Sequence, residues 1–206
     1  MTDYENITQE AFFNKSPFVQ TKRPLSTYLR IFEIPRKKIY KLHGKKILLV
    51  GGGNSPIKKT FDRLKINCNI TNIDPYIINP ETAHTNLKID FTETKFTNEF
   101  DEIWALYSLP LYSPNIEHAI KFYLTAIIAL KPGGTLRIGG HPRIINNPLW
   151  APTHFPCTEY TIWGLDSILN TKYDLHFKLY HEFEKYTAPK TYIQKNKLNE
   201  QLLRCK

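Results

Sequence analysis

Three consecutive glycines follow a short apolar run, and a carboxylate stands about twenty residues further along the chain. The run Ile47–Val50 leads directly into Gly51, Gly52 and Gly53, and Asp74 ends a second strand-like run. Glycines let a backbone approach a ligand closely, and an acid at this spacing can accept hydrogen bonds from both hydroxyls of a ribose. These residues predict a site for a nucleoside-containing cofactor.

Other interpretations of the same residues stay open from spacing alone. The glycines could form a bare strand–helix turn, and Asp74 or Asp90 could cap a helix. A nicotinamide dinucleotide site would place a further small residue near Pro56, but proline is better suited to the first position of a helix.

The elements that must position these residues alternate between strand and helix patterns from Lys45 onward, which is typical of a doubly wound α/β domain. We expect an N-terminal arm or lid over residues 1–44, with a short helix over 26–32 capped by Ser26, and an α/β domain over residues 45–206. Two late strand patterns have no helix between them and are expected to pair antiparallel. The expected strands are 46–50, 69–73, 86–89, 101–107, 135–138, 173–180 and 191–194, and the expected helices of the α/β domain are 55–64, with its apolar face on Ile57, Phe61 and Leu64, and 115–130.

Composition bounds the class of protein. The 206 residues are 41% hydrophobic and 13% aromatic, which indicates a globular chain and excludes a disordered one. Three scattered cysteines indicate reduced thiols, and no apolar run is long enough to span a bilayer, so we expect a cytoplasmic protein without a membrane partner. The formal charge of +9 has two explanations, a lysine-rich composition or a basic face for nucleic acid.

Five segments together resemble the class I S-adenosylmethionine-dependent methyltransferases. Val50–Ser55 resembles the family's glycine-rich motif, Ile73–Pro75 the acidic end of its second strand, and Ala129–Leu136 the approach to its fifth strand. Ile89–Phe91 and Phe100–Leu109 are similar to the segments after strand three and in strand four. The resemblance covers about half of the chain, approximately residues 45–140, and each segment alone is common in nucleotide-binding proteins.

The resemblance implies a Rossmann-like, seven-stranded, mostly parallel sheet with an antiparallel last strand. It also implies S-adenosylmethionine as the cofactor and methyl transfer as the reaction, without naming a catalytic residue. In this interpretation Asp74 binds the ribose, Asp90 the adenine amine and Phe91 the adenine ring, while Leu106 lies beside the sulfonium. The full set of expected cofactor-binding residues is Gly51, Gly52, Gly53, Asn54, Asp74, Pro75, Asp90, Phe91 and Leu106.

The expected acceptor is a small molecule, because the segment Tyr107–Tyr112 resembles that of small-molecule methyltransferases more than the Asn-Pro-Pro-Tyr motif of many amide methylases. Tyr107, Tyr112 and His141 are the expected acceptor-binding residues, and no metal site is expected. Besides a different reaction of the same cofactor, such as aminopropyl transfer, two alternatives remain. One is an RNA-modifying methyltransferase, with RNA bound by the basic arm that includes Lys22, Arg23, Arg30, Arg36, Lys37 and Lys38.

The other alternative is a binding module that has kept the fold and lost the chemistry. Two departures from the family motivate it. Leu49 stands where the family commonly has an acid, and Ser55 stands where a third glycine is usual.

Overall fold

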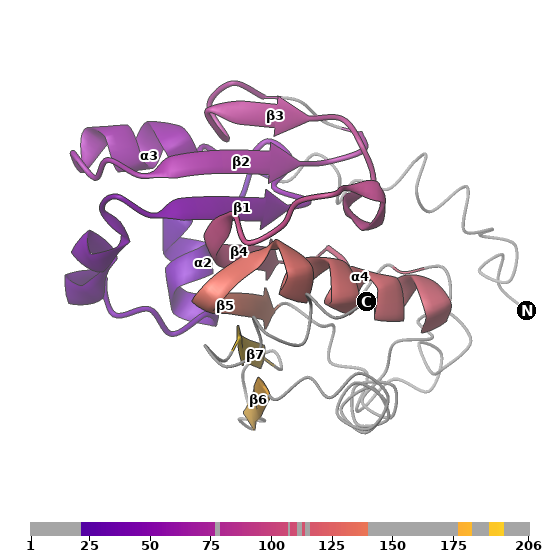
Figure 1. The fold of residues 1–206 in the computed structure, drawn as a ribbon. Coiled ribbons are helices and arrows are strands. Elements are labelled where there is room, and N and C mark those ends of the chain that lie inside the picture. The colour runs from indigo at the N-terminus through magenta and orange to yellow at the C-terminus, as the bar shows by residue number, and fades with distance from the viewer. Residues whose placement is uncertain are drawn as a thin grey trace, which may run out of the picture.

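The protein is an α/β domain whose centre is a parallel sheet of five strands (Figure 1). The computed structural model describes residues 22–76, 79–106, 108–110, 113, 116–139, 177–182 and 190–195. Neighbouring parallel strands follow the order β3-β2-β1-β4-β5, so the chain turns back at β1 and β4. Their bounds are Lys46–Val50 for β1, Asn69–Ile73 for β2, Thr85–Leu87 for β3, Phe100–Leu106 for β4 and Leu130–Gly139 for β5.

Two further strands lie beyond β5. β7 (Lys190–Lys195) pairs antiparallel with β5, and β6 (Phe177–Glu182) pairs antiparallel with β7 at the edge of the sheet. The backbone of β6 therefore runs in the same direction as the five central strands.

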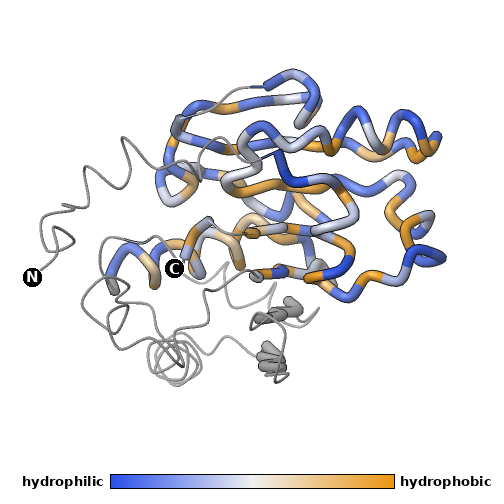
Figure 2. The backbone as a smooth tube through the Cα atoms, turned by 180° about the vertical axis from the view of Figure 1, so that it is seen from behind, coloured by the Kyte–Doolittle hydropathy of each residue, from blue (hydrophilic) through white to orange (hydrophobic). Residues whose placement is uncertain are grey.

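Alternating side chains of the central strands pack against helices on both faces of the sheet. On β1, Ile47 and Leu49 belong to one core cluster, whereas Leu48 and Val50 belong to another. The first cluster contains buried residues of α2 (Leu25–Ile31) and α3 (Ile57–Arg63), and the second contains those of α4 (Ile116–Ala129). Because both faces are covered, β1 reads as a continuous apolar run after Lys46, and the apolar residues of the central strands appear as orange segments in Figure 2. The expected two-sided α/β architecture is confirmed.

The segment before β1 packs on the sheet. In α2, Leu25 and Tyr28 are buried, and the ring of Tyr28 stacks on Trp104 of β4 with centroids 6.0 Å apart. The prediction that Ser26 caps this helix is wrong, because Pro24 occupies the N-cap and α2 begins at Leu25. A 3-10 helix, η3 (Arg36–Leu42), then leads to β1.

The helix after the glycines is shorter than expected. α3 begins at Ile57, preceded by Pro56 at its N-cap, and both Ile57 and Phe61 are buried as predicted. The prediction that Leu64 completes this apolar face is wrong. Leu64 is the C-cap residue, one position beyond the end of the helix, and 40% of it is exposed.

The boundary between α4 and β5 also differs from the prediction. We expected Lys131–Gly134 to separate helix from strand, but β5 begins at Leu130, which pairs with Phe100. An irregularity in the register between Phe100 and Glu102 accommodates the extra residues, and Gly133 adopts a φ of 81° there. A glycine pair therefore marks a bulge within the strand instead of a loop before it.

The other parallel strands match their expected bounds or differ from them by one or two residues. β1 and β2 match the predicted ranges, β4 is shifted back by one residue, and β3 ends at Leu87. Asp90 therefore lies beyond β3 and precedes η4 (Phe91–Glu93).

Within the described ranges, no helix is long and apolar enough to cross a membrane.

Candidate functional site

The glycine turn lies where β1 ends, at the carboxyl edge of the parallel strands. Gly51 and Gly53 have φ angles of +67° and +54°, which side-chain-bearing residues rarely adopt. A Cβ on Gly51 would lie 2.5 Å from the Cβ of Ser108, whose hydroxyl donates a 2.6 Å hydrogen bond to the Val50 carbonyl. The first glycine is thus required both by its backbone conformation and by the close approach of the segment after β4.

The second glycine is held by a buried amide that the sequence interpretation did not include. The N–H of Gly52 donates to Oδ1 of Asn72 at 3.0 Å, and Nδ2 of Asn72 donates to Oδ1 of Asn86 at 3.2 Å. Asn72 is fully buried in β2. A polar residue between Ile70 and Ile73 in a buried strand was the available signal, because such a group must have a partner.

Asp74 joins the second strand to the glycine turn. Its Oδ2 accepts a 3.0 Å hydrogen bond from the N–H of Gly53, and its Oδ1 accepts one of 2.9 Å from the N–H of Tyr76. The carboxylate is buried, with 6% of the residue exposed. The two features that the sequence singled out, 21 positions apart, therefore meet at one hydrogen bond.

Asn54 and Pro75, the residues that follow the turn and the acid, lie nearer the surface. Asn54 is half-buried, and its Oδ1 accepts a 3.3 Å hydrogen bond from Nδ2 of Asn79. Pro75 is exposed. Thr82 closes the far side of the turn by donating from Oγ1 to the Gly53 carbonyl at 2.9 Å.

Both departures from the family pattern have structural roles. Ser55 is fully buried, and its Oγ accepts a 3.3 Å hydrogen bond from the hydroxyl of Tyr28, which ties α2 to the glycine turn. Burial raises the pKa of Tyr28, and the hydrogen bond to Ser55 only partly offsets that effect. Leu49 is fully buried in the apolar cluster shared with α2 and α3, where an ionised acid would be strongly disfavoured.

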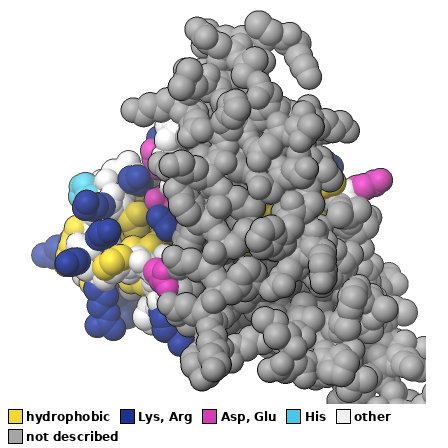
Figure 3. Space-filling view, turned by 90° about the horizontal axis from the view of Figure 1, so that it is seen from below, with side chains coloured by type: hydrophobic (Ala, Val, Ile, Leu, Met, Phe, Trp, Pro, Cys, Tyr) yellow, Lys and Arg dark blue, Asp and Glu magenta, His cyan; other side chains and the backbone are white. Residues whose placement is uncertain are grey.

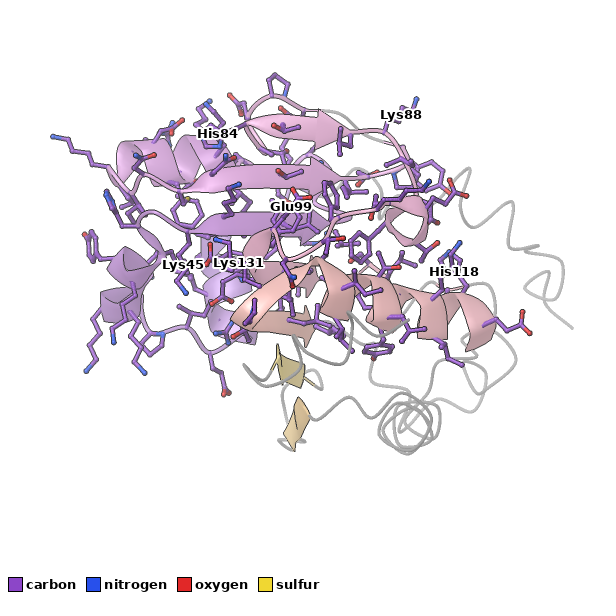
Figure 4. All side chains as sticks on the ribbon, in the orientation of Figure 1. Lys45, His84, Lys88, Glu99, His118 and Lys131 are labelled. Atoms are coloured by element: carbon purple, nitrogen blue, oxygen red, sulfur yellow. The ribbon has the colours of Figure 1, made fainter. Side chains whose placement is uncertain are left out.

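Asp90 caps η4, which was one of the roles left open. Its Oδ1 accepts hydrogen bonds of 2.8 Å from both the N–H and the hydroxyl of Thr92. Its Oδ2 lies 3.1 Å from Nε2 of His118, a residue of α4 that Figure 4 labels. The Oγ of Ser113 lies 3.2 Å from Nδ1 of the same ring, so the imidazole bridges a hydroxyl and a carboxylate.

Sequence reasoning missed His118 and Ser113. His118 lies 28 positions from Asp90, in the helix that follows β4 in the chain, so no local sequence pattern places the two residues together. A half-buried histidine on a helix with an otherwise apolar face was the available signal.

Two aromatic residues lie near Asp90, and one of them, Phe91, is buried whereas the other, Tyr76, is exposed. The ring of Phe91 is buried and makes an edge contact with Phe122, at a centroid distance of 5.5 Å. Tyr76 is 46% exposed. Partial burial, followed by the carboxylates of Asp90 and Asp74, raises the pKa of its phenol, so Tyr76 lies within electrostatic reach of both acids.

Leu106 ends β4 in the first core cluster, and its carbonyl accepts a 3.2 Å hydrogen bond from Nη1 of Arg23. This contact brings the segment before α2 to the carboxyl edge of the sheet.

Tyr107, Tyr112 and His141, expected to bind the acceptor, lie outside the described residues. Among the residues that are described, no group of three His, Cys, Asp or Glu side chains is arranged to hold a metal ion.

Comparison with solved structures shows the fold. A protein from Pyrococcus horikoshii OT3 superposes with a TM-score of 0.57 at 11% identity, covering 90% of this chain and 98% of that one. An S-adenosylmethionine-dependent methyltransferase from Methanosarcina mazei gives 0.51 at 15% identity, covering 79% and 97% of the two chains. The N-methyltransferase NodS from Bradyrhizobium japonicum gives 0.51 at 14% identity, covering 83% and 93%.

NodS has also been crystallised with S-adenosylhomocysteine, and that complex is similar to this chain with a TM-score of 0.50. The expected resemblance to the class I S-adenosylmethionine-dependent methyltransferases is therefore confirmed at the level of the fold. No protein-family model matches the chain, and no curated protein matches it either.

Proposed function

We propose that this protein transfers a methyl group from S-adenosylmethionine to a nucleophile and releases S-adenosylhomocysteine. The observation that carries the proposal is the junction of Gly53 with Asp74, which places a bare glycine turn beside a buried carboxylate at the carboxyl edge of β1 and β2. Open α/β sheets bind their ligands at this edge, where the strand order reverses. The fold shared with methyltransferases of known structure supports the same conclusion.

The glycine turn has the form that a nucleoside cofactor needs. Gly51 and Gly52 carry no side chain, and a Cβ added at either would collide with Ser108 or Asn72, so this turn keeps its shape only with glycines. In this proposal the turn passes under the methionine and ribose parts of the cofactor and Asp74 accepts hydrogen bonds from the ribose hydroxyls. The exposed Tyr76 and Pro75 lie next to the ribose.

Asp90 and Phe91 are proposed to hold the adenine. Hydrogen bonds from Thr92 and the contact with His118 fix the Asp90 carboxylate, so that it is oriented before the adenine amine arrives. Preorganisation of this kind lowers the entropic cost of binding. The proposed position of Leu106, beside the sulfonium, follows from its place at the end of β4.

The reaction itself requires little from the protein beyond alignment. S-adenosylmethionine supplies an electrophilic methyl group on a positively charged sulfur. The acceptor atom forms a bond to the methyl carbon, the carbon–sulfur bond breaks with its electron pair left on sulfur, and the acceptor's proton goes to solvent or to a base. Holding the reactants in line supplies a large part of the rate, so no catalytic residue is assigned.

We propose a small-molecule acceptor, on the strength of the strand-four segment Tyr107–Tyr112, with RNA as the second candidate because of the basic residues before β1.

We further propose that β6 and β7 complete the seven-stranded sheet of the class I methyltransferases, with β7 as its antiparallel strand. The cytoplasmic location and the division at residue 45 stay predictions.

Isothermal titration with S-adenosylmethionine, and separately with S-adenosylhomocysteine, tests the proposal. We expect micromolar binding of both. Absence of binding at millimolar concentrations in the presence and absence of candidate acceptors would instead favour a binding module that has lost the cofactor site.

A further inference from the structure

The positive charge of this chain is concentrated in one segment. Residues 22–46 contain nine Lys and Arg and a single acid, Glu33, and so carry a formal charge of +8 out of the +9 of the whole protein. The other residues are nearly neutral. A general lysine-rich composition would spread the excess along the chain, so the excess in this segment calls for a local explanation.

The centre of this segment is η3, whose geometry sorts its side chains into rows. Residues three apart lie above one another in a 3-10 helix. One row, Ile39 and Leu42, is buried in the first core cluster and fixes the helix to the domain. The other rows, Lys37 with Tyr40 and Lys38 with Lys41, are exposed.

These two rows, with the exposed Arg36 at the start of η3 and the half-buried Lys45 just after it, form a surface that we call the η3 basic surface. It is made of Arg36, Lys37, Lys38, Tyr40, Lys41 and Lys45. Tyr40 is the most exposed large hydrophobic residue in the described part of the chain, at 63%. None of the five cations makes an ion pair with a described residue, whereas Lys58, Lys59 and Lys131 elsewhere each do.

The η3 basic surface lies at the end of the sheet where the parallel strands begin. The N–H of Gly44 donates to the Asn67 carbonyl at 2.6 Å, just before β2, and Lys46 opens β1. Figure 1 shows η3 on the left, opposite the carboxyl ends of the strands, and Figure 3 shows the Lys and Arg side chains gathered at the same end of the molecule. A ligand on this surface would leave the glycine turn uncovered.

We propose that the η3 basic surface binds single-stranded nucleic acid, with the cations on phosphates and Tyr40 stacked on a base. Unpaired cations around an exposed aromatic ring combine the two contacts by which proteins hold single strands. A membrane surface is a poorer match, because the apolar residues of η3, Ile39 and Leu42, face the core and cannot enter a lipid layer. This inference does not depend on the proposed methyl transfer.

Fluorescence anisotropy with labelled oligo(U) and oligo(dT) twelve-mers, without cofactor, tests the proposal. We expect binding at low salt, with log K falling against log [salt] at a slope of about −3 if four or five phosphates are contacted. The variant Lys37→Glu/Lys38→Glu should bind at least about tenfold more weakly and show a slope reduced by about 1.4. The matched control is Lys95→Glu/Lys121→Glu, the same charge change at two exposed lysines elsewhere.

A second variant tests the aromatic contact without changing charge. Tyr40→Ala should weaken binding about fivefold or more, and Tyr40→Phe should restore it, since stacking needs the ring and not the hydroxyl. The proposal is overturned if no salt-dependent binding is seen, if either the η3 charge variant or Tyr40→Ala binds as the parent does, or if the control variant loses as much. Preferential binding to vesicles containing phosphatidylserine would overturn it in favour of a lipid surface.

Discussion

Asp74 has two roles at the scale of single residues, since it organises the glycine turn and is proposed to hold the ribose. Replacing it by Asn keeps one carbonyl oxygen for the N–H of Gly53, removes the charge and gives up the second acceptor, which the N–H of Tyr76 uses. We expect Asp74→Asn to weaken binding of S-adenosylhomocysteine by about ten- to a hundredfold, the loss typical of a charge-assisted hydrogen bond. Calorimetric titration measures this loss. Asp62→Asn, a change at an exposed acid of α3, is the control and should bind normally.

Gly52 is constrained by space alone. Its Cβ would lie 2.5 Å from Oδ1 of Asn72 and 3.1 Å from Cγ2 of Thr82, both on buried side chains. We expect Gly52→Ala to lower the free energy of unfolding by about 1–3 kcal/mol, as overpacking does. Urea denaturation compares it with Gly44→Ala. At Gly44 no atom lies within 4 Å of the added Cβ, so only the strain of a φ of +75° is added, and a loss at Gly44 as large as that at Gly52 would contradict the steric explanation.

The residues of the site divide by how local their contacts are. The glycines could be predicted because a turn with positive φ angles favours glycine, and three glycines in a row are visible in the sequence. Asp74 could be predicted from its position at the end of the next strand, at the spacing expected for a ribose-binding acid. Asn72 was missed although it lies two positions before Asp74. The role of a buried amide depends on its hydrogen-bond partner, here the N–H of Gly52, which the sequence does not identify. The set of Asp90, His118 and Ser113 could not be predicted, because its geometry depends on how α4 packs beside η4.

At the scale of elements, strands were predicted better than helix ends. β1 matches its expected bounds because it is a continuous apolar run that ends sharply at Gly51. β2 also matches its expected bounds, although Thr71 and Asn72 interrupt its apolar residues. Helix ends depend on caps, and the presence of proline at both N-caps, Pro24 and Pro56, displaced the expected starts. The segment that forms the β5 bulge was predicted to be a loop, because a Gly-Gly pair occurs both in loops and in bulges.

Asp101 fastens the beginning of β4 to its neighbours on both sides. Its Oδ2 accepts hydrogen bonds from the N–H of Lys46 and from Nζ of Lys131, each at 2.8 Å. Partial burial alone would raise the pKa of Asp101, but these two bonds, together with the charges of Lys131 and Lys45, outweigh it and hold the pKa below its ordinary value of 3.8. A depressed pKa adds stability above the ordinary value, and that stability is lost as the pH falls through the folded-state pKa.

We therefore expect Asp101→Asn to lower the free energy of unfolding by about 1 kcal/mol at pH 7, with a smaller difference from the parent below pH about 4. Urea unfolding at a series of pH values measures the difference. The explanation fails if the gap between the two proteins is constant down to pH about 2.

At the scale of the whole molecule, the sheet is stabilised by two core clusters of different origin. The cluster with α4 is built from residues of β1 and of later elements, whereas the other is completed by residues that precede β1, including Leu25 and Phe32. Phe32 is buried against Trp104, with ring centroids 5.8 Å apart. Gly139 of β5 packs against α2, where a Cβ on this glycine would lie 2.5 Å from Cγ2 of Ile31.

This packing gives the segment before β1 a predicted role in stability. We expect Phe32→Ala to lower the free energy of unfolding by about 3–5 kcal/mol, the cost of truncating a buried aromatic ring. A chain that begins at residue 45 should then fail to unfold cooperatively, because Trp104 and Leu106 lose the side chains that cover them. Far- and near-ultraviolet circular dichroism during thermal unfolding measures both effects, and Tyr40→Ala, at an exposed position, is the control. If the shortened chain unfolds cooperatively near the parent's midpoint, the segment is a removable arm, and the contacts of α2 add little to the stability of the domain.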